Sequence, residues 1–242
     1  MKKGLLLLII GLVAVMALSL VGCTESNSGS QQTGIWVSGE GKVSAVPDLA
    51  TLNLGVESQQ NTVQEAQTEA ATTMTALVAA LKANGVADKD IQTTSFSINV
   101  VTKWDEKTYE QITIGYKVTN TVTAKLRDMT KVGTVIDAAA EAGGNLTRVN
   151  SISFSVDDPT NYYTQAREEA VNNAKAKAEQ MATLAGATLG KVTYISESSY
   201  YAPINYTKEA YDMATAGASP STPISAGELE ITLTVQLGYS LK

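Results

Sequence analysis

The chain has 242 residues, with 24 acidic against 18 basic side chains, one cysteine and no histidine. These counts exclude an internal disulfide, zinc centres built from histidine and cysteine, and Ser-His-Asp or Cys-His catalysis. The formal charge of −6 and the lack of a basic patch argue against nucleic acid as a partner.

The first predicted element is a lipoprotein signal peptide over residues 1–22. Two lysines precede an apolar run from Leu5 to Leu20, and the run ends in Leu-Val-Gly-Cys at residues 20–23. We expect cleavage before Cys23 and lipidation of Cys23, because several acyl chains anchor a protein stably. The alternative is an uncleaved membrane span, but the run is short for the about 20 residues that a span needs. The predicted location is extracytoplasmic, lipid-anchored to the cell envelope, either periplasmic or on the outer surface.

Residues 23–33 are predicted to be a lipidated flexible tether, because they are polar and have little to bury. Residues 34–242 then form one domain. Strands are expected over 35–46 and 50–56, joined as a hairpin by Pro47-Asp48, and Gly39-Glu40-Gly41 suggests a bulge or bend. A helix follows over 63–81, capped by Thr62 and ended by Asn84-Gly85.

The next predicted element is an unusually long hairpin, with strands over 91–104 and 109–126. A helix over 129–139 and a strand over 152–156 follow it. A third helix runs over 159–185 with alanine recurring on one face, so that it can lie close to a sheet. Strands over 192–196 and 229–239 flank a loop at 198–226, which is long for a compact domain.

The resulting order is ββαββαβαββ. It predicts a single-domain α+β fold, mostly antiparallel sheet with helices packed on one face. No linker divides residues 35–242, and the strand after the long loop cannot fold alone.

Carboxylates are the remaining candidates for catalysis, as a pair for glycoside hydrolysis. Local roles at helix starts and turns explain each of them better, and the spacing of Asp157-Asp158 does not match a calcium-binding EF-hand loop. We therefore predict no catalytic residue, no cofactor, no metal site and no enzymatic activity. The carboxylates considered are Glu40, Asp48, Asp157, Asp158, Glu168 and Glu169.

Aromatic side chains are the candidate contact residues for a partner. Four lie in the long loop and one at the tip of the long hairpin: Tyr200, Tyr201, Tyr206, Tyr211 and Trp104. Tyrosine and tryptophan offer rigid contact area with a polar tip. The alternative is that the tyrosines fold back over the core and that Trp104 packs locally.

The domain resembles the SIMPL-type family, a bacterial domain family of unknown function. The matching stretches cover nearly all of residues 35–242 in order: Val37-Ser38-Gly39-Glu40-Gly41, Pro47-Asp48, Gly55-Val56, Asp90-Ile91-Gln92-Thr93, Phe96, Tyr116-Lys117-Val118-Thr119-Asn120, Val132-Gly133, Ile136-Asp137, Phe154, Ala166-Arg167-Glu168-Glu169-Ala170, Lys177-Ala178-Glu179 and Leu189-Gly190. The resemblance implies an α+β fold, relatives among periplasmic immunogenic and oxidative-stress defence proteins, and ring-shaped oligomers in some members. It implies no catalytic residues. The lipobox sets this chain apart from many soluble members.

The sequence therefore predicts a membrane-anchored envelope lipoprotein that acts by self-assembly, as a homo-oligomer, or by binding an envelope protein. Envelope or oxidative-stress tolerance is the setting that the resemblance implies. The first alternative is a ligand- or glycan-binding module that uses the Tyr-rich loop 198–226, and the second is a weak carboxylate hydrolase.

Overall fold

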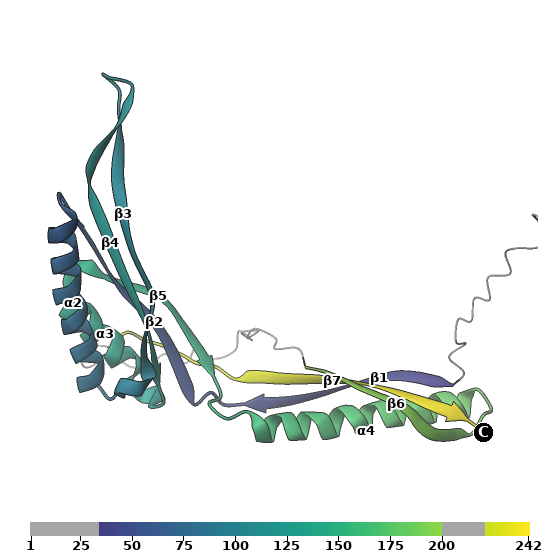
Figure 1. Cartoon of the computed structure of the whole chain (residues 1–242). Coiled ribbons are helices and arrows are strands. Elements are labelled where there is room, and N and C mark those ends of the chain that lie inside the picture. The colour runs from purple at the N-terminus through teal and green to yellow at the C-terminus, as the bar shows by residue number, and fades with distance from the viewer. Residues whose placement is uncertain (1–33, 200–220) are drawn as a thin grey trace, which may run out of the picture.

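The computed structural model describes residues 34–199 and 221–242, which form two lobes along an elongated molecule (Figure 1). The α+β class and the predicted element order are confirmed. The helices and strands are β1 (Ile35–Ala45), β2 (Leu49–Gln60), α2 (Val63–Ala83), β3 (Ile91–Asp105), β4 (Glu110–Leu126), α3 (Val132–Gly143), β5 (Thr147–Ser155), α4 (Thr160–Leu184), β6 (Leu189–Ser199) and β7 (Leu229–Leu241).

The strands form two antiparallel sheets rather than one. One sheet has the order β1-β7-β6 and the other has the order β3-β4-β2-β5. The expected hairpin of β1 and β2 is therefore wrong: β1 pairs with β7 along its whole length, while β2 pairs with β4 and β5. Residues 46–48 carry the chain from one sheet to the other, and Pro47 cannot donate a ladder hydrogen bond there.

The alanine face of α4 packs against the three-stranded sheet, as the sequence predicts. Five alanines at four-residue spacing are almost fully buried: Ala166, Ala170, Ala174, Ala178 and Ala182. A Cβ on Gly39 would lie 2.0 Å from the Ala170 carbonyl oxygen, and one on Gly41 would lie 1.9 Å from that of Ala166. The lack of a side chain at these two glycines allows α4 to approach β1 closely. The expected bulge in β1 is wrong, because the β1–β7 register has no shift.

Side chains of α4 also cover the outer edge of β1. The Glu40 N–H donates to Asn173 Oδ1 at 3.2 Å, and the Lys42 N–H donates to Glu169 Oε2 at 3.1 Å. Lys177 Nζ donates to the Ser38 carbonyl oxygen at 2.9 Å. A row of polar side chains four residues apart on one helix thus satisfies backbone groups that an edge strand would otherwise expose.

The helices α2 and α3 pack on the four-stranded sheet and bury its core. The core includes Leu52, Leu54 and Val56 of β2 and Leu77 and Leu81 of α2, all with 0% exposure. The predicted N-cap of α2 is confirmed, because the Thr62 side chain accepts a hydrogen bond from the Glu65 N–H. The predicted end at Asn84-Gly85 is also confirmed, with Gly85 at a φ of +99°.

The β3–β4 hairpin projects beyond the helices, as Figure 1 shows. Its strands have 15 and 17 residues, which confirms the long hairpin of the sequence prediction. The described last residues of the predicted loop, 221–226, lie against the four-stranded lobe, where Ile224 and Ala226 pack against the core. The chain then returns to the other lobe as β7.

Candidate functional surfaces

The β3–β4 hairpin carries a run of exposed apolar side chains, called here the hairpin surface. Its members are between 41% and 57% exposed: Phe96, Ile98, Val100, Trp104, Ile112 and Ile114. Trp104 pairs with Gln111 and Lys103 pairs with Ile112, so Trp104 and Ile112 lie on opposite faces of the hairpin. Exposed apolar side chains gathered on one element are unfavourable in water and indicate an interaction site. The surface follows from the fold, because α2 packs against β2 and β4 and leaves β3 uncovered.

Two further features make this hairpin a candidate contact. Within the described residues β3 pairs only with β4, so its outer edge keeps unpaired backbone groups that can accept another strand. Trp104 is 53% exposed near the tip, opposite Gln111, so it is not a core residue. Its role as a partner contact stays a prediction.

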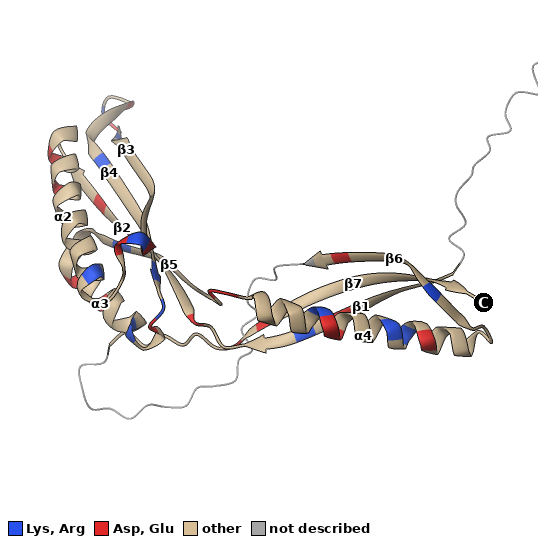
Figure 2. Ribbon diagram, turned by 60° about the horizontal axis from the view of Figure 1, so that its bottom comes forward, with Lys and Arg blue, Asp and Glu red and all other residues tan. Residues whose placement is uncertain are grey.

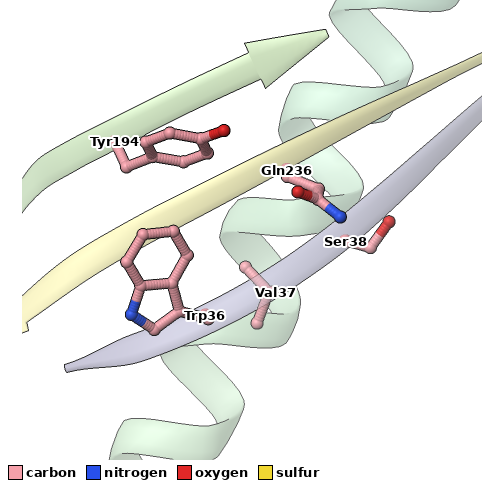
Figure 3. Close-up of a pocket in the computed structure, with 5 residues that line it drawn as sticks. All are labelled: Trp36, Val37, Ser38, Tyr194 and Gln236. Carbon is pink, nitrogen blue, oxygen red and sulfur yellow. The ribbon is translucent and has the colours of Figure 1, made fainter. Parts of the chain in front are cut away.

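A groove on the three-stranded sheet is a second surface, and sequence reasoning missed its central residue. In β1, Ile35 and Val37 face α4, so Trp36 projects from the opposite face. The rings of Trp36 and Tyr194 lie 5.0 Å apart across β7 (Figure 3). Gly238 lies beneath them, and a Cβ there would be 3.2 Å from the indole and 3.1 Å from the Tyr194 Cβ.

This groove has a volume of about 480 Å³ and uncharged walls. Ser38 and Gln236 add a hydroxyl and an amide beside the two rings (Figure 3). Alternation in β1 was the signal that could have identified Trp36, because the residues on either side of it are apolar and core-facing.

The candidate carboxylates at the junction of the lobes have structural partners. Asp48 accepts a hydrogen bond from the Asp157 N–H at 2.7 Å, and Asp157 pairs with Arg127 at 2.8 Å. Arg127 also pairs with Asp90 at 2.7 Å, and these two carboxylates raise the pKa of its guanidinium. Asp158 accepts from the Thr160 hydroxyl and N–H at the start of α4, which lowers its pKa.

Two of the three remaining candidate carboxylates, Glu40 and Glu169, also act locally. Glu40 and Glu230 flank Lys42 at 3.3 and 3.2 Å and raise its pKa, and Glu169 covers the β1 edge. Glu168 is exposed on α4. The described residues contain no group of three or more Asp, Glu, Cys or His side chains placed to hold a metal ion. Charges of both signs are scattered over the two lobes (Figure 2).

Several sequence predictions lie outside the described residues. They include the signal peptide, lipidation of Cys23, the tether and the contact tyrosines Tyr200, Tyr201, Tyr206 and Tyr211. Over residues 34–199 and 221–242, no helix is both long and apolar enough to cross a membrane.

Comparison with known proteins gives one family and several relatives. The model of SIMPL, described as a protein of unknown function (DUF541), matches residues 35–239. The chain is 34% identical over 241 residues to the 26 kDa periplasmic immunogenic protein of Brucella melitensis, covering 96% of this chain and 94% of that protein. It is 29% identical over 220 residues to the uncharacterized protein YggE of Escherichia coli K12, covering 91% and 85%.

Proposed function

The chain belongs to the SIMPL family, and from this premise we propose that it is a lipid-anchored envelope protein that works by self-assembly or by binding an envelope protein. The observation that carries the proposal is the hairpin surface, which combines exposed apolar side chains with an unpaired strand edge. The proposed role is non-enzymatic, because five of the six candidate carboxylates have structural partners and the sixth, Glu168, is exposed on α4.

The extracytoplasmic location has two supports. The sequence begins with the features of a secretory signal, and the Brucella relatives are named periplasmic. Lipid anchoring has the support of Leu-Val-Gly-Cys at residues 20–23. We expect membrane fractions to contain an acylated protein that begins at Cys23, and mass spectrometry of the N-terminal peptide tests this. Cys23→Ser should move the protein out of the membrane fraction.

The hairpin surface is tested by the mass of the purified mature chain in solution. We expect an oligomer that Ile98→Thr and Val100→Thr dissociate, because these substitutions keep β propensity and remove apolar contact area. Val149→Thr is the matched control, since Val149 is 43% exposed on β5 and lies outside the hairpin surface. Analytical ultracentrifugation of the wild type and each variant separates the outcomes.

A strictly monomeric wild type would refute self-assembly and leave partner binding. Binding of an envelope protein is then tested by crosslinking in intact cells, with a photoreactive amino acid in place of Trp104. The same photoreactive amino acid in place of Val149 is the control. If the two positions yield the same crosslinks, the hairpin surface is not the contact. Oxidative-stress tolerance stays a prediction, tested by survival of a deletion strain under peroxide.

A further inference from the structure

The end of the three-stranded lobe where the chain enters the domain is called here the tether end. It consists of the first residues of β1 and β6 and the last residues of α4 and β7. Ile35 pairs with Tyr239, Leu189 pairs with Leu241, and the Lys242 N–H donates to the Thr188 carbonyl oxygen at 2.9 Å. The C-terminus marked in Figure 1 lies at this end. Because Gly34 is the first described residue, any anchor at Cys23 connects here.

The tether end is rich in exposed apolar and aromatic side chains. Leu184 is 80% exposed in the last turn of α4, and Leu241 is 46% exposed at the end of β7. Trp36 and Tyr194, 38% and 42% exposed, lie together on the face of the sheet that points away from α4, where β1 begins (Figure 3). Tryptophan and tyrosine favour the headgroup level of a bilayer, while leucine favours its hydrocarbon.

The charge of the tether end differs from that of the chain as a whole. Residues 34–39, 180–196 and 236–242 contain no aspartate or glutamate, although Glu179 and Glu197 border them. Burial and the nearby charge of Glu179 raise the pKa of Tyr239, so one carboxylate lies just behind the tether end. The same three ranges contain two lysines, Lys191 and Lys242, both exposed. Lysine is attracted to the phosphates of anionic lipid, whereas acidic side chains would be repelled by them.

The length of the tether limits how far this end can stand from a membrane. Cys23 precedes Gly34 by 11 residues. That length reaches about 40 Å when fully extended and about 18 Å as a coil. An acylated Cys23 would therefore hold the apolar tether end within reach of the bilayer.

We propose that the tether end rests on the lipid surface, with Leu184, Leu241, Trp36 and Tyr194 at the interface and the two lysines on headgroup phosphates. This inference depends on the proposed lipid anchor. It also orients the molecule, because the β3–β4 hairpin lies at the other end and would be held far from the bilayer (Figure 1).

The two tryptophans of the chain make the test specific, since Trp36 lies at the tether end and Trp104 in the hairpin surface. Trp104→Phe leaves Trp36 as the reporter, and Trp36→Phe leaves Trp104. Each acylated variant is reconstituted into phosphatidylethanolamine–phosphatidylglycerol vesicles with and without brominated acyl chains. We expect brominated lipid to reduce Trp36 fluorescence about twofold or more, with little change for Trp104.

A second substitution tests the contact itself. Leu184→Glu places a carboxylate at the tether end and should weaken the quenching of Trp36. Val149→Glu, in the other lobe, should leave it unchanged. Thermal unfolding of every variant checks that the domain stays folded.

The outcomes separate the inference from the proposed function. Unquenched Trp36 in a protein whose mass shows acyl groups would overturn the orientation and keep the anchor. Equal quenching of both tryptophans would also overturn the orientation. A protein without acyl groups at Cys23 would overturn the anchor and the orientation together. If soluble peptidoglycan fragments change Trp36 emission and lipid does not, the groove binds a glycan, and the inference fails.

Discussion

Gly39→Ala should destabilise the three-stranded lobe strongly, although it adds only one methyl group. The new Cβ would lie 2.0 Å from the Ala170 carbonyl oxygen and 2.7 Å from the Ala174 Cβ. Non-bonded heavy atoms pack at about 3.5–4.0 Å. Helix α4 would therefore have to move from β1 by about 1.5 Å, and the nearest atom belongs to a helix backbone that cannot rotate away.

The magnitude follows from what this displacement breaks. Overpacking of a tight interface costs about 1–3 kcal/mol. The bonds from Asn173 and Glu169 to the β1 edge contribute about 0.5–1.5 kcal/mol each. The expected loss is about 2–6 kcal/mol, a large fraction of the about 5–15 kcal/mol by which domains are stable.

Urea denaturation followed by the fluorescence of a single tryptophan measures the loss in the lobe concerned. In a Trp104→Phe background, Trp36 reports on the three-stranded lobe. Ser38→Ala is the control, because its side chain points away from α4, and it should change the free energy of unfolding by less than about 0.5 kcal/mol. A Gly39→Ala protein that unfolds at the wild-type urea concentration would show that α4 does not pack on β1 as described.

Three further predictions concern single contacts. Asn173→Ala should cost about 1 kcal/mol in urea denaturation, because it leaves the Glu40 N–H without its partner. Asp137→Ala should release the last residues of the long loop, because the Thr222 N–H donates to Asp137 at 3.0 Å. Faster amide exchange of these residues would report the release, and Glu141→Ala, elsewhere on α3, should have no effect. Hydrogen bonds from Ser58 and Gln60 lower the pKa of Glu69 in the folded protein. The charged Glu69 carboxylate therefore stabilises the fold fully above its ordinary pKa of 4.5, and this stabilisation is lost as the pH falls through the lower pKa of the folded protein. Glu69→Gln should therefore flatten the fall in melting temperature between about pH 5 and pH 2.

The sequence predicted the helices and strands better than it predicted which strands pair with one another. Period and capping placed β7, α2 and the long hairpin close to their observed bounds, because those signals are local. The pairing of β1 was wrong because alternation shows that a strand has an apolar face and does not say which strand lies beside it. Sequence neighbours usually pair, and here Pro47 moves the chain to a second sheet instead.

The same limit applies to the candidate surfaces. Gly39 and Gly41 indicated a special backbone in β1, but the residues that require them, Ala170 and Ala166 of α4, lie 125 residues or more along the chain. Alternation in β1 indicated that Trp36 faces outward. Its contact with Tyr194 could not be predicted without knowing the strand order β1-β7-β6. Exposure of the hairpin surface could not be predicted, because an alternating apolar strand normally indicates a covered face.

The contrast between two of the four edge strands, β1 and β3, gives the last prediction. Strand β1 has its edge covered by a dedicated row of α4 side chains, while β3 has an uncovered edge next to apolar side chains. Proteins protect edges that must not pair, and a lysine on an edge strand blocks pairing. Ser95→Lys on β3 should therefore reduce assembly, whereas Ser38→Lys on β1 should leave it unchanged, although both serines are exposed. Sedimentation of the two variants decides the matter: equal effects would mean that the uncovered edge of β3 has no special role.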